Sequence, residues 1–488
     1  MADEKEPSLV VALIPVVFLI TMLVMNQQMF KDDATYGPNQ LALLLSGMLT
    51  LSIGFLHLKV SYKKIEKNII DSIGLSLQAC LILLVVGSLI SIWILSGIVP
   101  TMIFYGLKII NPSYFLPVAC ISCAMVALAT GSSWSTTGTI GVALMGIGQA
   151  LSIPIPMCAG AIISGAYFGD KMSPLSDTTN LAPAMAGTDL FTHIRHMVYT
   201  SGPAIIISII GYFILGFYYS GTGTDASSVD AILTIIKSNF NIGLHLFLVP
   251  LILLILISKK MAAFPALIIG TILGVIAAVF FQWELLTKLT SNTIDIAQAY
   301  KEVIKIAFSG FNFDFQDPIV NKLFNRGGMA SMLNTVWLIM MAMVFGGAME
   351  GTGMLQKIAS TILQFVVGAG SLIGATLATC LFLNMTASDQ YLAIVVPGKM
   401  FKSAYDDMGL HPKNLSRALE DSGTVTSVLI PWNSGGAYNT KVLGVGSEYL
   451  YSYQMYCFFN ILSPLVSLFL ASMNLTIERV CDEKSSQA

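Results

Sequence analysis

The chain of 488 residues is 55% hydrophobic and 11% charged, with a mean hydropathy of +0.76. A soluble domain carries about 25% charged residues, so this composition excludes an ordinary soluble protein and predicts an all-α polytopic membrane protein. The net charge of −2, from 25 basic and 27 acidic residues, argues against a nucleic-acid-binding surface.

The N-terminal apolar run, residues 8–30, predicts a first membrane span that stays in the mature protein. It follows an acidic start, lacks a basic n-region and shows no small-residue cleavage site, unlike a signal peptide. The loop after the second apolar run carries Lys59, Lys63, Lys64 and Lys67. Because cytoplasmic loops are enriched in Lys and Arg, this cluster predicts a cytoplasmic N-terminus.

About ten apolar runs predict helices that cross the membrane. They cover residues 9–29, 39–58, 72–97, 114–129, 197–219, 243–258, 261–282, 334–350, 371–385 and 453–473. Shorter or broken segments lie between 130 and 190 and between 386 and 446. Residues 229–240 and 289–307 place apolar side chains at helical spacing beside charged ones, which predicts interfacial helices or connectors.

A weak internal repeat relates the two halves of the chain. A shift of 256 residues places Gly97 over Gly353 and Thr130 over Thr386. Each half then has a long span, a glycine break, a short amphipathic piece, another span, a polar tip and a proline-marked break. Interrupted spans at matching positions of two halves are typical of secondary transporters with inverted repeats. The predicted division is 1–68 for N-terminal spans, 69–196 for the first inverted repeat with its hairpin and broken helix, 197–330 for linking spans and interfacial helices, 331–446 for the second inverted repeat, and 447–488 for a C-terminal span and tail.

Residues 169–183, GDKMSPLSDTTNLAP, interrupt the apolar sequence with two prolines and many oxygen-bearing side chains. Inside a bilayer, non-helical backbone is tolerated only where protein or a water-lined cavity satisfies its polar groups. Hydroxyl, amide and carboxylate oxygens suit a small alkali cation. The predicted ion-binding residues here are Ser176, Asp177, Thr178, Thr179 and Asn180. The alternative is a solvent-exposed loop, because Pro, Ser, Asp and Asn are ordinary turn residues.

A second polar stretch, TGSSWSTTGTIG from Thr130, predicts the tip of a re-entrant hairpin. Its hydroxyls add Ser132, Ser133, Thr136 and Thr137 to the predicted ion-binding residues. Its glycines suit close approach to another backbone. The alternative is a small-residue face that packs helices together, and both readings are compatible.

The second half offers NMTASDQYLAIVVPGK from Asn384 and IPWNSGGAYNTK from Ile430. They contribute the predicted ion-binding residues Ser388, Asp389, Asn433 and Ser434. An ionisable residue inside the membrane is a functional candidate by default. The alternative for Asp389 is a helix N-cap that faces water.

Glu350 ends a strongly apolar run and joins Asp177 and Asp389 as a proton-carrier candidate. The alternative is that Glu350 marks the water interface. Glu420 and Asp421 follow Arg417, which favours an ion-paired helix surface. Asp170 and Lys171 are expected to neutralise one another.

No GxxxxGK[ST], GxSxG or HExxH motif occurs in the chain. The sequence therefore gives no support to ATP-driven pumping or to proteolysis. We expect a protein that is not an enzyme, uses no cofactor, binds no nucleic acid and draws on an ion gradient.

The chain resembles the NhaC-type Na⁺/H⁺ antiporter family, which includes malate/lactate exchangers. The matching phrases are ATGSSWSTTGTIGVALMGIG (129–148), GAYFGDKMSPLSDTTNLAPAMAGTDLFTHIRHM (165–197), FGGAMEGTG (345–353) and IPWNSGGAY (430–438). The resemblance implies an ion-transporter-superfamily fold with two inverted repeats, re-entrant helical hairpins and broken transmembrane helices. It also implies a homodimer in the cell membrane. Related dicarboxylate carriers have Ser-Asn-Thr at each hairpin tip, and this chain departs from that pattern with GSSWSTT and TASDQ.

The resulting hypothesis is a secondary active Na⁺/H⁺ antiporter that works by alternating access. Na⁺ and H⁺ would compete for one carboxylate-containing site, so that either ion displaces the other. The alternative is a Na⁺/H⁺-coupled malate/lactate exchanger, which needs a cationic or amide partner for a carboxylate. The candidates for that partner are Lys171, Arg195, Lys399, Arg417 and Asn433. A passive channel and a membrane enzyme are disfavoured, because no pore-like ring and no catalytic constellation is apparent.

Overall fold

The computed structural model describes residues 5–30, 33–34, 36–220, 226–259, 261–290, 295–445 and 453–480. These residues form helices and connecting turns, and apart from one isolated β-bridge they contain no extended pairing. Eight of the described helices are long and apolar enough to cross a membrane. The predicted fold class, an all-α polytopic membrane protein, is therefore confirmed.

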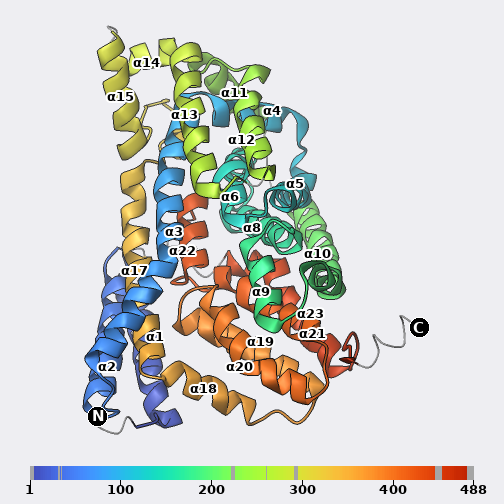
Figure 1. Cartoon of the computed structure of the whole chain (residues 1–488). Helices are drawn as coiled ribbons and strands as arrows, with labels where there is room; N and C mark the ends of the chain where they lie inside the picture. Colours follow the sequence, from blue (N-terminus) through green and yellow to red (C-terminus); the bar gives the residue numbers. More distant parts are fainter. Residues whose placement is uncertain are drawn as a thin grey trace.

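The helices follow one another along the chain in the order shown in Figure 1. The first half contains α1 (Leu9–Phe30), α2 (Pro38–Leu56), α3 (Tyr62–Leu95), α4 (Ile98–Ile109), α5 (Phe115–Thr130), α6 (Ser133–Thr136), α7 (Val142–Ala150), α8 (Ile155–Met172) and α9 (Asp177–Ala186). The linking helices are α10 (Leu190–Ser220), α11 (Ala226–Asn239), α12 (Leu248–Ser258), α13 (Ala263–Phe281), α14 (Trp283–Leu289), α15 (Ile296–Ser309) and α16 (Pro318–Phe324). The second half contains α17 (Leu333–Gly351), α18 (Met354–Leu363), α19 (Ala369–Thr386), α20 (Leu392–Asp407), α21 (Pro412–Ala418), α22 (Ser434–Leu443) and α23 (Phe458–Ser472).

The first long helices of the two halves, α3 and α17, pack side by side in opposite directions. Near the start of α3, Ile65 lies against Gly351 at the end of α17, where an added Cβ would come within 2.9 Å of the Ile65 Cα. Towards the end of α3, the Gly87 carbonyl accepts a hydrogen bond of 2.7 Å from the Gly328 N–H, just before α17. The chain leaves α3 for α4 at the top of Figure 1 and leaves α17 for α18 at the bottom. The first long helices of the two halves thus run in opposite directions, as an inverted repeat predicts.

A glycine separates the long helix from the short one in both halves. Gly97 (φ 76°) precedes α4 and Gly353 (φ 75°) precedes α18. Both are in the left-handed conformation, which glycine adopts without the steric cost of a Cβ. Gly97 and Gly353, which the sequence shift of 256 residues aligned, therefore form the same turn in the two halves.

Each half also contains one polar hairpin tip and one polar interruption between two helices, called the tip and the break below. The first tip lies between α5 and α6, and the second lies between α19 and α20. The first break separates α8 from α9, and the second precedes α22. Two π-helical turns, Thr137–Gly141 and Leu419–Thr424, follow the first tip and precede the second break. Such turns are frequent at functional sites.

Two of the predicted spans form shorter helices than the apolar sequence suggested. The run 243–258 begins with a 3₁₀ turn before α12, and Val229–Asn239 meets Leu244–Ser258 at an angle of 87°. The run 453–473 forms α23, whose 15 residues span about 22 Å at ~1.5 Å per residue. In the part of the chain that the structure describes, up to nine spans result if the bent pair counts as one. The last predicted domain boundary, between 446 and 447, lies outside the described residues.

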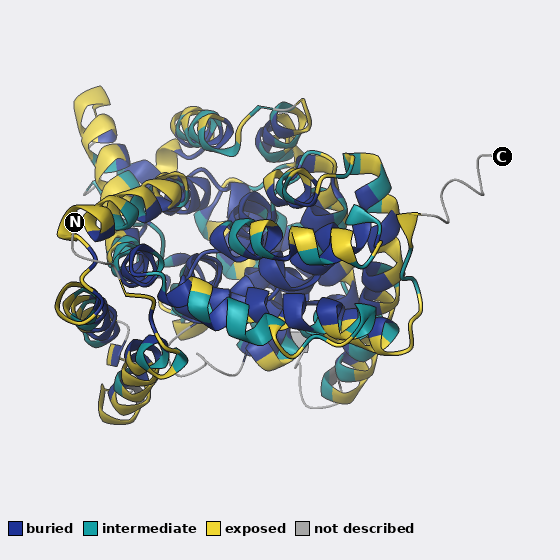
Figure 2. Ribbon diagram, turned by 60° about the horizontal axis from the view of Figure 1, so that its bottom comes forward, coloured by how far each residue is buried: buried dark blue, intermediate teal, exposed yellow. Residues whose placement is uncertain are grey.

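Glycines allow a close contact between α5 and α8. A Cβ on Gly165 would lie 2.0 Å from the Cys120 carbonyl oxygen, and one on Gly169 would lie 2.2 Å from that of Ala124. Small residues commonly let membrane helices approach in this way. Figure 2 shows the buried residues concentrated in the central helices, whereas the outer helices expose one face.

We expect Gly165→Ala to destabilise the protein by about 1–3 kcal/mol, because its methyl group would push α8 away from α5. Gly74→Ala on α3 is a matched control, since no atom lies within 4 Å of the added Cβ. That control should be neutral or slightly stabilising. Thermal unfolding of both variants in detergent measures the difference, and equal melting temperatures would contradict the tight contact.

Candidate ion-binding cavity

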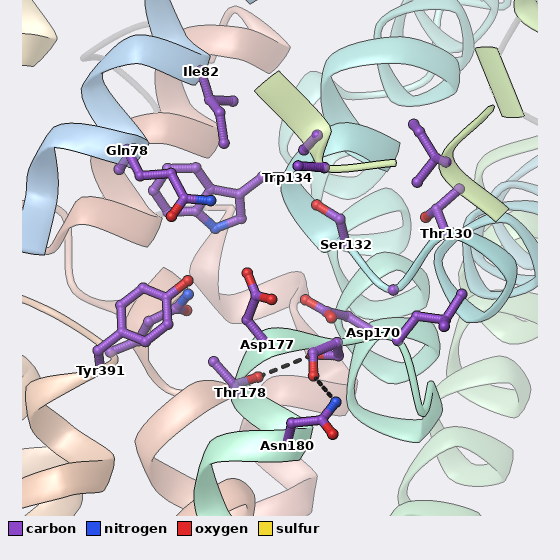
Figure 3. A pocket seen from close by; sticks show the side chains of 18 of the residues that line it. Gln78, Ile82, Thr130, Ser132, Trp134, Asp170, Asp177, Thr178, Asn180 and Tyr391 are labelled. Atoms are coloured by element: carbon purple, nitrogen blue, oxygen red, sulfur yellow. Dashed lines mark hydrogen bonds between the residues drawn. The ribbon is translucent and has the colours of Figure 1, made fainter. Parts of the chain in front are cut away.

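A cavity of about 450 Å³ lies where the two tips and the two breaks come together. Figure 3 shows side chains from α3, the first tip, the first break and the second tip around this space. Its polar lining residues are Gln78, Thr130, Ser132, Asp170, Ser176, Asp177, Thr178, Asn180, Asp389, Gln390, Tyr391 and Ser434. The cavity thus combines oxygen-bearing residues from both halves.

The first break is held by its own side chains. Ser176 ends the break as the N-cap of α9, and its Oγ lies 3.2 Å from the Thr178 Oγ1. Asn180 Nδ2 donates to the carbonyls of Pro174 at 3.0 Å and Ser176 at 2.7 Å. These bonds satisfy backbone groups that the break would otherwise leave unpaired. They also hold the start of α9 against the cavity.

Asp177 is the first residue of α9, and its carboxylate points into the cavity in Figure 3. The residue is exposed, whereas its neighbours Ser176 and Thr178 are buried. No described residue donates a hydrogen bond to its carboxylate. Its position at a helix N-terminus favours negative charge, so Asp177 presents an open carboxylate to an entering cation.

Asp170, which the sequence paired with Lys171, instead faces the first tip. Its Oδ2 accepts hydrogen bonds from the Ser133 N–H at 3.0 Å and the Ser133 hydroxyl at 2.6 Å. Its Oδ1 is buried without a hydrogen-bond partner. The predicted neutralisation was wrong because consecutive residues of a helix point about 100° apart, and Lys171 turns away to Asp421.

The second tip positions another carboxylate. Asp389 accepts hydrogen bonds from the N–H groups of Tyr391 at 2.8 Å and Leu392 at 3.2 Å, and the Ser434 hydroxyl donates to it at 3.3 Å. These bonds hold the turn before α20, but Asp389 does not face water as the N-cap alternative expected, because it is only 2% exposed and lines the cavity. Ser388 turns the chain with φ 58°, which leaves the carboxylate facing the first half.

Seven of the predicted site residues do not line the cavity, and several support those that do. Ser133 holds Asp170, and Asn433 caps α22 and donates to the Asn384 carbonyl and side-chain oxygens at 3.0 Å each. Thr136 and Thr137 bond to backbone carbonyls of their own hairpin, in line with the packing alternative. The others outside the lining are Thr179, Ser388 and Glu350.

Glu350 lies partly buried at the end of α17. It interacts electrostatically with Lys399 and Asp71 and is not among the residues that line the cavity. Thr179 donates to the Lys171 carbonyl at 3.0 Å and so belongs to the joint between α8 and α9. Neither Glu350 nor Thr179 therefore lines the cavity that Asp177 lines.

The sequence did not single out Gln78, Trp134, Asp170, Gln390 or Tyr391 as site residues. Gln78 carried a signal, because it is an isolated amide in the apolar sequence of α3. Trp134 stacks on Tyr438 with ring centroids 4.3 Å apart, and the Tyr438 hydroxyl donates to the Trp134 carbonyl at 2.6 Å. This aromatic pair fixes the first tip against α22, a contact that no local pattern predicts.

A buried ionic cluster lies behind the cavity. Lys171 pairs with Asp421, and the Lys171 Nζ also donates to the Ser463 hydroxyl at 3.0 Å. Thr200 donates to Asp421 at 2.8 Å, and the Arg417 Nε lies 3.9 Å from its other oxygen. Arg417, Glu420 and Asp421 are all 0% exposed. The predicted ion-paired surface was wrong in two respects: only Asp421 is paired, since Glu420 has no ion-pair partner among the described residues, and both are buried. They are buried because α21 and the following π-helical turn pack against α19, α20 and α23.

The cavity presents negative charge and hard oxygen atoms. Three aspartates line it, and no Lys or Arg is found among the described residues that do so. No three His, Cys, Asp or Glu side chains in the described ranges converge on a single metal ion. A cation there would therefore be held by one carboxylate with hydroxyls, carbonyls and water, as alkali and other hard cations commonly are.

Comparison with known proteins connects this architecture to transport. Residues 165–475 match the model of the Na⁺/H⁺ antiporter family. The chain is 37% identical over 447 residues to a malate-2H⁺/Na⁺-lactate antiporter of Bacillus subtilis, covering 92% of this chain and 91% of the relative. It is 37% identical to the Na⁺/H⁺ antiporter NhaC of Alkalihalophilus pseudofirmus (84% and 85% covered). It is 34% identical to the arginine/ornithine antiporter ArcD of Halobacterium salinarum (95% and 91% covered). The chain belongs to the Na⁺/H⁺ antiporter family.

Proposed function

We propose that this protein exchanges Na⁺ for H⁺ by alternating access, with both ions using the cavity lined by Asp170, Asp177 and Asp389. The observation that carries the proposal is the meeting of three carboxylates from both halves in one cavity. Hydroxyls of Ser132, Ser176, Thr178 and Ser434 line the same space and add oxygen ligands. The family membership, and a relative of similar length that is a Na⁺/H⁺ antiporter, support the same reaction.

Competition for one carboxylate is sufficient for exchange. A carboxylate that binds a proton has lost the charge that attracts Na⁺, and bound Na⁺ opposes protonation in the same way. Asp177 is the preferred carboxylate for this competition because it is open to the cavity. Asp389, which accepts three hydrogen bonds, lines the same cavity and is placed to join Asp177 in holding Na⁺. Glu350 stays a candidate for carrying a proton at a second position, and the Na⁺-driven proton flux of Glu350→Gln would test this role.

Purified protein in proteoliposomes provides the test. An inward Na⁺ gradient, with no organic acid present, should drive proton efflux that a pH-sensitive dye in the lumen records. An inward proton gradient should likewise drive ²²Na⁺ out. Failure of Na⁺ alone to move protons would reject the proposed exchange.

The second candidate, malate/lactate exchange, is favoured by the Bacillus subtilis relative. It needs a group that receives a carboxylate, and the candidates are engaged elsewhere. Lys171 and Arg417 are buried in the ionic cluster, and Asn433 supports the second tip. Arg195 and Lys399 are exposed and do not line the cavity. Counterflow of labelled malate against lactate tests this candidate directly.

We further propose a cell-membrane location, a cytoplasmic N-terminus and a homodimer. Lys59, Lys63, Lys64 and Lys67 are exposed, which supports a cytoplasmic position for the loop before α3. Labelling of a cysteine introduced at Lys63 with a membrane-impermeant reagent, in intact and opened cells, tests the orientation. Light scattering of the detergent complex tests the homodimer. We also propose that the chain divides into structural parts after residues 68, 196, 330 and 446.

A further inference from the structure

Glu420 is a buried carboxyl group that the exchange described above does not use. It is 0% exposed and lies in the π-helical turn Leu419–Thr424. Neither of its carboxyl oxygens has a hydrogen-bond partner. A buried carboxylate without a partner is expensive, because nothing replaces the water that it has lost. An occupant that supplies positive charge would remove that cost.

Other unpaired oxygens surround Glu420. The hydroxyls of Thr424 and Thr178 lie beside its carboxyl group without reaching hydrogen-bond geometry, and Asp170 and Lys171 are close enough to interact with it electrostatically. This placement agrees with the packing of α9 against the π-helical turn and with the pairing of Lys171 and Asp421. The Thr424 hydroxyl and the Asp170 Oδ1 are also buried without a partner. Four buried atoms of this region, namely both Glu420 oxygens, Thr424 Oγ1 and Asp170 Oδ1, therefore have no hydrogen-bond partner. Carboxylate and hydroxyl oxygens are the ligands that hard cations take.

The charges of the cluster agree with one missing monovalent cation. Asp170, Glu420 and Asp421 carry three negative charges when ionised, and Lys171 and Arg417 carry two positive ones, which leaves −1. The count takes His193 and Cys380, which lie beside the cluster, as neutral. A single Na⁺ would bring the buried group to zero charge.

The cluster is continuous with the cavity. Asp170 and Thr178 line the cavity on one side and face Glu420 on the other. The start of α9 and the end of α8 thus form the wall between the cavity and the buried carboxyl group of Glu420. A cation that reaches Asp170 could pass to Glu420 by exchanging ligands across this wall.

We propose that Glu420, Thr424, Thr178 and Asp170 form a second Na⁺ site behind the wall of the cavity. The site deepens the proposed function and rests on it, because it assigns a second transported Na⁺ to the same exchange cycle. The protein then binds two Na⁺ ions, one at Asp177 in the cavity and one at Glu420.

Equilibrium binding of ²²Na⁺ to the purified protein in detergent tests the second site. The unmodified protein should bind two Na⁺ at saturation, and Glu420→Gln should bind one. Asp177→Asn should also bind one, and the two variants combined should bind none. Glu284→Gln, an exposed carboxyl on α14, is the matched control and should keep both.

Thr424→Val keeps the carboxylate and the side-chain shape but removes one hydroxyl ligand. We expect it to weaken one of the two binding steps about tenfold, or ~1.4 kcal/mol, and it decides the question if Glu420→Gln does not fold. An unchanged Na⁺ count in Glu420→Gln, or unchanged affinity in Thr424→Val, overturns the second site and would mean that a proton occupies Glu420. The count is measured without transport, so it is separate from the flux assay that tests the exchange itself.

Discussion

Replacing Asp177 with Asn is expected to abolish Na⁺-driven proton flux in proteoliposomes. Asn keeps the size of the side chain but can neither carry the proton nor supply the negative charge that attracts Na⁺. Removing one partner of a charge pair in a partly buried site costs about 3 kcal/mol, or roughly 100-fold in affinity. Because Asp177 receives no hydrogen bond from the described residues, its loss should leave the fold intact. Flux and thermal stability measured on the same preparation separate the two effects.

A matched control makes the Asp177 result specific. Asp406→Asn removes an exposed carboxylate near the end of α20, away from the residues that line the cavity. Its flux should equal that of the unmodified protein. Unchanged flux in Asp177→Asn would remove this residue from the mechanism and leave Asp389 and Asp170 as the carboxylates to test.

Much of the architecture was predictable because the bilayer constrains sequence strongly. Apolar runs identified most of the spans, and Gly97 and Gly353 marked the same turn in both halves. The two breaks were recognisable because prolines and oxygen-bearing side chains are rare within apolar helices. The spans predicted at 243–258 and 453–473 were too long, because hydropathy does not show where a 3₁₀ turn or a sharp bend shortens a helix.

The site was predictable only in part, because its assembly depends on contacts between distant segments. Ser132, Ser176, Asp177, Thr178, Asn180, Asp389 and Ser434 line the cavity, and their role as ion ligands stays a prediction. Asp170 was missed because its sequence neighbour Lys171 looked like its partner, although Lys171 pairs 250 residues further along. Trp134 and Tyr391 were missed because aromatic residues in apolar sequence carry no sign of facing a cavity.

Breaking the ion pair between Lys171 and Asp421 should have the largest effect on stability. Both side chains are 0% exposed, and the Asp421 Oδ1 also accepts hydrogen bonds from Thr200 at 2.8 Å and Ser463 at 3.2 Å. Removing one partner of a buried pair costs about 3–5 kcal/mol, because the other charge stays in the interior without compensation. Lys171→Met and Asp421→Asn should each lower the melting temperature and the yield of monodisperse protein.

The double variant Lys171→Met with Asp421→Leu distinguishes a pairing effect from a loss of packing. Removing both charges also removes the penalty of the unpaired one, and apolar replacements of buried pairs are often neutral. We therefore expect the double variant to be more stable than either single variant. Its residual cost should come from the buried Arg417, which loses its carboxylate partner, and from the hydroxyls of Thr200 and Ser463, which lose their acceptor. Additive destabilisation would show that the two side chains contribute separately, and that the joint between α8 and the π-helical turn depends on shape rather than on charge.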